Sequence, residues 1–169
     1  MDVDLGVLII RLAIGVTLIV HGLNKLFGPG GLQGTEAWFS SLGLRPAWLH
    51  ARLAAATEIG AGALMAVGLL TGLAAAAFIG LMAVATLTDH RGKGFFVFKG
   101  GWEYTVVLAA VSVAVASIGP GDWSLDHVFG LDLAGIAWSI AATAIGGIAG
   151  AGLLVAFLRP EPKPGQSAP

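Results

Sequence analysis

The sequence contains no cysteine. This absence excludes disulfide bonds, thiolate metal sites, persulfide chemistry and cysteine nucleophiles. It also means that cysteine usage gives no information about the redox state of the compartment. Charged residues are scarce as well, at 11% of the chain, whereas a soluble domain has about a quarter. Because hydrophobic residues make up 56% of the sequence, the composition predicts a membrane protein.

Several functional signatures are also missing. The net charge is −1 and the basic residues form no cluster, which argues against a nucleic-acid partner. No nucleotide-binding loop, nucleophile elbow or zinc motif occurs. Residues 1–4 carry two aspartates where a secretory signal needs positive charge, so we expect the first apolar run to be retained. The histidines lie at unrelated spacings, and we expect them to hold neither a metal nor a haem: His21, His50, His90 and His127.

What the sequence does contain is a set of long apolar segments. Each is bounded by turn residues or charges and is expected to form a membrane-spanning helix, although the third is short for a span. The second and third are joined by Thr71-Gly72 alone, which predicts a tight antiparallel hairpin. The five segments are 5–25, 50–70, 73–88, 102–119 and 133–158.

The basic residues indicate an orientation for five spans. All eight of them other than Arg11 fall in the first connector, the third connector or the tail. Since connectors alternate between the two faces, these basic residues gather on one side, which the positive-inside rule makes cytoplasmic. The prediction is an N-terminus outside, a C-terminus inside and a disordered cytoplasmic tail over 159–169, which is rich in proline.

Ionisable residues inside the apolar segments are the candidate functional groups. Arg11 lies about two turns into the first helix, where an unpaired charge costs at least ~2.5 kcal/mol. Glu58 is its candidate partner, although the contact is stretched, and the alternatives are that Arg11 extends to the outer surface and that Glu103 faces lipid headgroups. We predict a buried polar site made of Arg11, His21, Lys25, Glu58 and Glu103.

The remaining apolar features suggest packing surfaces. In the fifth segment, Gly146 and Gly150 have the spacing that lets helix backbones approach closely, although small residues can also simply fill an apolar helix. Residues 35–42 are expected to form a short helix in the membrane interface, and Phe95-Phe96-Val97-Phe98 an apolar patch there.

The order of these motifs resembles the DoxX family of small bacterial integral membrane proteins. The resemblance covers about residues 8–127 and rests on Arg11–Gly15, His21–Phe27, Glu58–Leu64 with Gly68–Thr71, the Gly94-Phe95 pair, Glu103 and Gly119–Asp126. It implies an all-α fold with a four-helix transmembrane bundle at 1–132, to which 133–158 adds a fifth helix. It also implies a respiratory or redox-linked setting, because the family takes its name from a subunit linked to quinol and thiosulfate:quinone oxidoreductases.

Three functional hypotheses follow. The first is an accessory subunit of a redox-linked membrane complex in the bacterial inner membrane. The second is a quinone- or lipid-binding oxidoreductase component that uses the buried polar site, with quinone as the cofactor. The third is a small-solute or proton-coupled carrier. No catalytic motif decides whether the chain is an enzyme; the expected partners are the lipid bilayer and other membrane or redox proteins, with a homo-oligomer as an open alternative.

Overall fold

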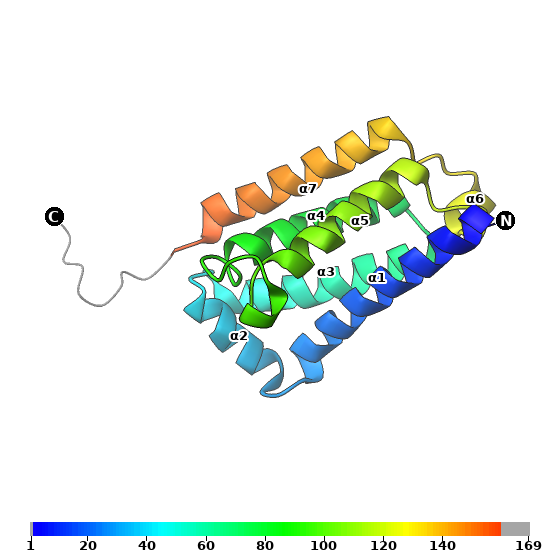
Figure 1. The fold of residues 1–169 in the computed structure, drawn as a ribbon. Helices are drawn as coiled ribbons and strands as arrows, with labels where there is room; N and C mark the ends of the chain where they lie inside the picture. The colour runs from blue at the N-terminus through cyan, green and yellow to red at the C-terminus, as the bar shows by residue number, and fades with distance from the viewer. Residues whose placement is uncertain (1, 160–169) are drawn as a thin grey trace, which may run out of the picture.

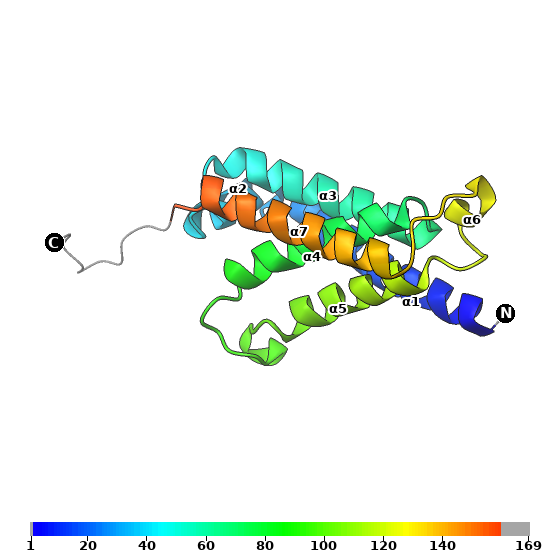
Figure 2. The same ribbon diagram turned by 90° about the horizontal axis from the view of Figure 1, so that it is seen from above.

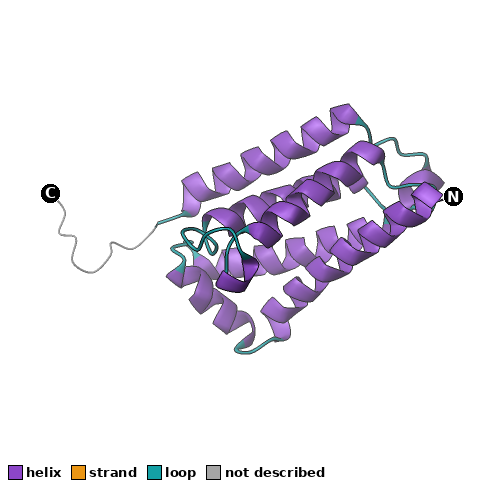
Figure 3. Ribbon diagram, viewed as in Figure 1, coloured by secondary structure: helices purple, strands orange, loops and turns teal. Residues whose placement is uncertain are grey.

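The structure is a computed structural model that describes residues 2–159. These residues are all-α, with no β-strand among them (Figure 3), which confirms the all-α prediction. The elements in chain order are α1 (Asp2–Phe27), α2 (Gly31–Ser41), α3 (Ala47–Val67), α4 (Thr71–Leu87), the 3₁₀ turn η1 (Val97–Lys99), α5 (Glu103–Ile118), α6 (Leu125–Phe129) and α7 (Ile136–Phe157).

The five long helices lie side by side and coincide with the five predicted segments (Figure 1). The predicted hairpin is present: α3 ends at Val67 and α4 begins at Thr71. The short helix expected over 35–42 is α2, which begins earlier, at Gly31. The short helix α6 is not among the predicted elements.

Two helices, α1 and α7, are long and apolar enough to cross a membrane by length and composition. Helices α4 and α5 are apolar but have only 17 and 16 residues, or ~26 and ~24 Å against a hydrocarbon core of ~30 Å. Helix α3 has 21 residues but carries Arg52 and Glu58. The count of five spans therefore stays a prediction.

The two ends of the bundle differ in charge. The N-terminus, the α3–α4 connector and the segment 119–135 share one end, held by contacts such as Asp122 N–H to Asp4 Oδ1. We call it the acidic end, because it carries Asp2, Asp4, Asp122, Asp126 and Asp132. The opposite end holds α2, the α4–α5 connector and the end of α7 (Figure 1). We call it the basic end, because it carries Lys25, Arg45, Arg52, Arg91, Lys93, Lys99 and Arg159.

Glycines allow α1 and α3 to pack with their backbones in contact. A Cβ atom added at Gly15 would lie 2.6 Å from the carbonyl oxygen of Gly62, and one added at Gly62 would lie 2.6 Å from that of Gly15. Gly22 meets the Ala55 carbonyl in the same way, at 2.9 Å. This pair forms the most extensive interhelical contact of the described chain.

A second close pair consists of α4 and α7. A Cβ atom at Gly80 would lie 3.0 Å from the Gly146 carbonyl oxygen, and one at Gly150 would lie 3.1 Å from that of Gly80. Gly146 and Gly150 are both buried, so these two residues pack against another helix as the spacing predicts, whereas Gly147 has no neighbour within 4 Å. Figure 2 shows α7 lying along α4, with α5 on the other side of α4.

The C-terminal end of the described chain is tied to the first connector. Leu44 and Leu158 form an isolated antiparallel bridge, and the Arg159 N–H donates to the Gly43 carbonyl at 2.7 Å. The disordered tail predicted over 159–169 lies outside the described residues except for Arg159, which is held by these contacts.

The glycine packing predicts a stability difference within one helix. Gly62→Ala places a methyl group against the backbone of α1, and such overpacking costs typically ~1–3 kcal/mol. Gly60, on the same helix, has no neighbour within 4 Å, so Gly60→Ala is the matched control. We expect thermal unfolding in detergent at a lower temperature for Gly62→Ala and not for Gly60→Ala. Equal unfolding temperatures for the two variants would contradict this packing.

Candidate functional site

A cavity of about 660 Å³ is lined by residues of α1, α2, α3, α4, α5 and α7. Its lining is mainly apolar, and its polar residues gather toward the basic end. A ligand-sized hollow with few converging polar groups is the usual form of a small-molecule site. The polar and ionisable side chains that line it are His21, Lys25, His50, Thr57, Glu58, Thr88, Asp89, His90, Tyr104 and Thr105.

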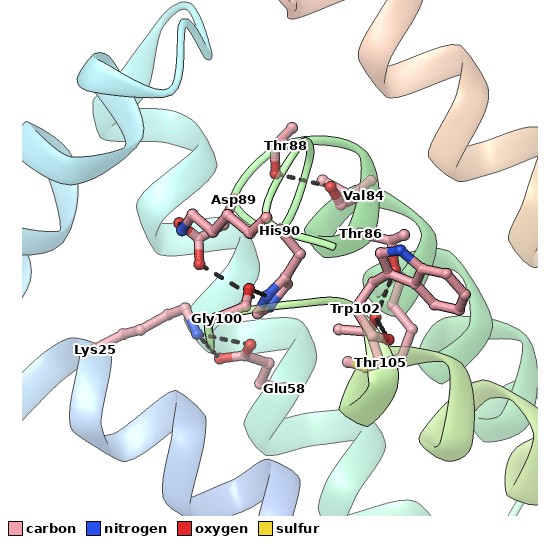
Figure 4. A network of polar contacts seen from close by, with 12 residues as sticks. Lys25, Glu58, Val84, Thr86, Thr88, Asp89, His90, Gly100, Trp102 and Thr105 are labelled. Carbon is pink, nitrogen blue, oxygen red and sulfur yellow. Dashed lines mark hydrogen bonds and ion pairs between the residues drawn. The ribbon is translucent and has the colours of Figure 1, made fainter. Parts of the chain in front are cut away.

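A buried ion pair lies in the wall of this cavity. Lys25 Nζ of α1 donates to both carboxylate oxygens of Glu58 in α3, at 2.7 and 2.6 Å. The two side chains are only 12% and 9% exposed. Gly22 brings the two helices together next to this pair, so the local close packing sets the distance between the charges. Figure 4 shows the two side chains pointing toward each other.

Other polar groups lie around the ion pair. The His21 ring stacks on the Tyr104 ring at 5.8 Å between centroids, which links α1 to α5. His90 Nδ1 lies 2.6 Å from the Gly100 carbonyl oxygen, and this bond holds the Asp89–His90 segment at the cavity (Figure 4). The arrangement gives the cavity several groups that can donate, accept or carry a proton.

Two cavity-lining atoms have no hydrogen-bond partner in the described residues. They are Nε2 of His50 and the hydroxyl oxygen of Tyr104, both buried. Buried polar atoms in folded proteins are nearly always hydrogen-bonded to protein or water. Both atoms are covered by protein in this structure and belong to residues that line the cavity, so a side-chain rotation would bring either one to a molecule there.

Arg11 lies in a separate polar cluster at the acidic end. Its side chain is fully buried, and Nη2 donates to the Trp123 carbonyl oxygen at 2.5 Å. The guanidinium lies against Gly68, where any Cβ atom would overlap it. The Asp126 carboxylate lies close enough to attract the Arg11 charge. The cluster therefore joins α1 to the α3–α4 connector and to the α5–α7 connector.

Asp126 also completes the start of α4. Its Oδ1 accepts from the Leu70 N–H at 2.7 Å and its Oδ2 from the Thr71 N–H at 2.9 Å. These are the free N–H groups that a helix start leaves unsatisfied. Leu70 has a φ of 50°, which leucine rarely adopts, and the Asp126 carboxylate holds it there.

The five predicted site residues thus do not form one group. His21, Lys25 and Glu58 line the cavity together. The Arg11 guanidinium lies against Gly68, which is ten residues after Glu58, or ~15 Å along a helix. Arg11 therefore does not pair with Glu58, whose ion-pair partner is Lys25. The carboxylate of Glu103 accepts from the Val97 N–H at 3.0 Å and does not line the cavity.

Asp126, whose charge attracts that of Arg11, is not among the predicted site residues, although the sequence contains a signal for it. The predicted topology places Arg11 near the outer face, and the α5–α7 connector is the one outer connector that carries carboxylates between spans. Within it, Ser124-Leu125-Asp126 starts a short helix, and the Ser124 hydroxyl accepts from the His127 N–H. His50 and Tyr104 were likewise not placed in the site. Among residues 2–159, no group of three histidine, aspartate or glutamate side chains could hold a metal ion.

These features define a class: a helical membrane protein with a ligand-sized cavity that is apolar except for a buried ion pair and a few polar groups. Comparison with known proteins then gives the family. The family model described as DoxX matches residues 6–91. The chain belongs to the DoxX family, as its motifs predict.

Two similar proteins have names that bear on function. The "Putative oxidoreductase CatD" of Bacillus subtilis (strain 168) is 30% identical over 112 residues, covering 66% of this chain and 79% of that protein. The "Uncharacterized membrane protein Rv3486" of Mycobacterium tuberculosis (strain ATCC 25618 / H37Rv) is 29% identical over 134 residues, covering 72% and 80%. No solved structure matches this chain.

The two clusters predict which charges are coupled. Removing one partner of a buried pair leaves the other uncompensated, which costs ~3–5 kcal/mol in proteins generally. We expect the unfolding losses of Arg11→Leu and Asp126→Asn to be non-additive, and likewise those of Lys25→Met and Glu58→Gln. Arg11→Leu and Glu58→Gln should add, because they share no partner.

The measurement is thermal unfolding of the single and double variants in one detergent. A double variant of Arg11 and Glu58 that recovers stability lost in the singles would contradict the separation of the two clusters.

Proposed function

We propose that this chain is a quinone-binding subunit of a redox-linked assembly in the bacterial inner membrane. The observation that carries the proposal is the cavity, which has an ion pair and two unpartnered buried polar atoms at its polar part and a mainly apolar remainder. A lipid-soluble quinone has the matching form, with carbonyl oxygens at one end and a hydrocarbon tail at the other. The oxidoreductase name of the Bacillus subtilis relative supports a redox role.

The residues of the polar part fit the ring of a quinone. Tyr104 can donate its hydroxyl hydrogen to a carbonyl oxygen, and His50 can donate from Nε2 in the tautomer that carries hydrogen there. Lys25 retains hydrogen-bond donors beyond those it gives to Glu58, because an ammonium group has three. A quinone supplies two-electron redox chemistry with uptake of two protons.

The Lys25–Glu58 pair is suited to moving protons next to such a ring. Its hydrogen bonds are 2.6–2.7 Å long and its two charges are largely shielded from water. A proton passed from Lys25 to Glu58 converts two opposite charges into two neutral groups and leaves the net charge of the pair at zero. When Glu58 gives that proton to the ring, the pair carries one negative charge until a proton taken up from water restores it. Asp89 and His90 line the same cavity, and their side chains are 29% and 20% exposed, so water can supply protons to them.

We further propose that α1, α3, α4, α5 and α7 are the five spans, with the acidic end outside and the basic end in the cytoplasm. The charge difference between the two ends supports this orientation by the positive-inside rule. Among residues 2–159, Arg11 is the one basic residue grouped with the acidic end, and its burial beside Asp126 removes it from the surface charge that the rule counts.

Extraction tests the quinone proposal. Full-length protein purified in mild detergent is extracted with organic solvent, and the extract is analysed by mass spectrometry. We expect a quinone at near-stoichiometric amounts from the wild type and at least about tenfold less from Glu58→Gln. This substitution removes the charge that positions the Lys25 ammonium group, whose charge-assisted hydrogen bond to the ring is worth ~1.5–3 kcal/mol. Glu36→Gln is the control. Glu36, like Glu58, forms an ion pair with a basic residue, in this case Arg52, but it does not line the cavity.

The outcomes separate the three functional hypotheses. A retained phospholipid in place of quinone would overturn the proposal, and so would solute flux through vesicles without any bound quinone. Redox proteins that co-purify with the chain but leave it free of quinone would favour an accessory subunit that binds no ligand.

Labelling of introduced cysteines tests the orientation, since the chain has no cysteine of its own. We expect an impermeant thiol reagent added to intact cells to label Asp2→Cys and Asp122→Cys. It should leave Gly30→Cys, Gly94→Cys and a cysteine in the tail unlabelled until the cells are opened. Labelling of the tail in intact cells would contradict the fifth span.

A further inference from the structure

The cavity has a second part with a different chemistry from the polar one. Along one side of the α4–α7 contact its lining consists of aliphatic side chains and glycines, including Leu73, Ala77 and Leu81 of α4 and Ile145, Ala149 and Leu153 of α7. This part is open at its side, since Leu73 and Ile145 are 44% and 49% exposed. We call this part the apolar arm. From Leu73 to Leu81 it follows α4 for ~12 Å. The arm has the length and the chemistry for a hydrocarbon chain.

Helix α7 is held as a wall of this arm by contacts at both ends and in the middle. At the basic end, the Arg45 N–H donates to the Phe157 carbonyl oxygen at 3.0 Å. In the middle, Gly146 packs against Gly80. At the acidic end, the Gly135 N–H donates to the Ala116 carbonyl oxygen at 3.0 Å. These contacts do not depend on a ligand, so the arm is formed before a ligand arrives.

Helix α7 contributes only to the apolar arm. Its cavity-lining residues carry no ionisable group, whereas Lys25, His50 and Glu58 belong to α1 and α3. Helix α7 also lies outside residues 6–91, which match the family model. Substitutions on α7 can therefore alter the arm and leave the polar part unchanged.

We propose that α7 is a tail-selecting wall, which makes this chain specific for quinones with a long hydrocarbon side chain. The proposal rests on the quinone-binding function above and adds to it the class of quinone bound. The tail is surrounded by lipid before it binds, so its gain comes from closer van der Waals packing against the arm. The polar part binds the ring alike for any tail.

The test compares two probes that share one ring: a quinone with a decyl side chain and its analogue with a methyl group in that place. Equilibrium binding of both probes to the full-length protein in lipid nanodiscs is measured. Probe concentrations are expressed per lipid, so that the different partitioning of the two probes into the bilayer does not enter the comparison. We expect the wild type to bind the decyl quinone at least about tenfold more tightly, or ~1.4 kcal/mol.

Substitutions on α7 should remove this preference. Ala149→Phe fills the arm and is expected to lower the affinity for the decyl quinone to that for the methyl analogue. Leu153→Ala removes contact area without adding bulk, and it should weaken decyl binding several-fold while methyl binding is unchanged. Ala151→Phe is the matched control, because Ala151 is exposed and does not line the cavity; it should behave as the wild type does.

The result also distinguishes this inference from the function on which it rests. If the wild type binds both probes equally, or if Ala149→Phe and Leu153→Ala both keep the tail preference, the role of α7 is refuted and the quinone site stands. If the wild type binds neither probe, the quinone-binding function fails and this inference fails with it.

Discussion

The structure depends on how the two buried cations of α1 are neutralised. Arg11 and Lys25 lie on an apolar helix. Arg11 donates to the Trp123 carbonyl oxygen and is attracted by the nearby Asp126 carboxylate, whereas Lys25 forms an ion pair with Glu58. A charge left alone in such surroundings is costly, so each pairing fixes the position of the element that supplies its carboxylate. The first brings the α5–α7 connector onto the α3–α4 connector, and the second sets the contact of α1 with α3 at the cavity. Helix α1 thereby contributes to both ends of the bundle. Arg11 is enclosed by backbone at the acidic end, whereas Lys25 faces the cavity toward the basic end.

Glycine packing explains why there is space at all. Helices α1 and α3 approach until Gly15 and Gly62 are in contact, and α4 approaches α7 at Gly80 and Gly146. The small residues lie within each helix pair, α1 with α3 and α4 with α7. The larger side chains therefore meet where one pair packs against the other. The core there is built from residues such as Leu18, Met65 and Phe78, and the cavity occupies the part that they do not fill. Polar groups near that part are consequently kept from bulk water but have few protein partners.

The sequence predicts most of the helices and only part of the site. Long apolar runs with glycine and proline between them define five helices because hydrophobicity and turn chemistry are local properties. The pairing of Lys25 with Glu58 was not predicted, although both residues were in the predicted site, because it depends on which faces of α1 and α3 meet. Asp126 was missed for a related reason: its role comes from a connector that folds back over the start of α4, and no periodicity marks such a contact. His50 and Tyr104 carry no signal in the sequence, since only the packed structure leaves their polar atoms without partners.

The cap that Asp126 provides for α4 bears on the order in which the protein is made. A ribosome completes α4 and all of α5 before it reaches Asp126, so the Leu70 and Thr71 N–H groups are made before the acceptor that they have in the finished protein. The α3–α4 turn therefore lacks this acceptor until residue 126 has been added. That turn takes its final form when the connector after α5 arrives, which makes the biosynthesis of the second half of the chain a condition for the final shape of the first.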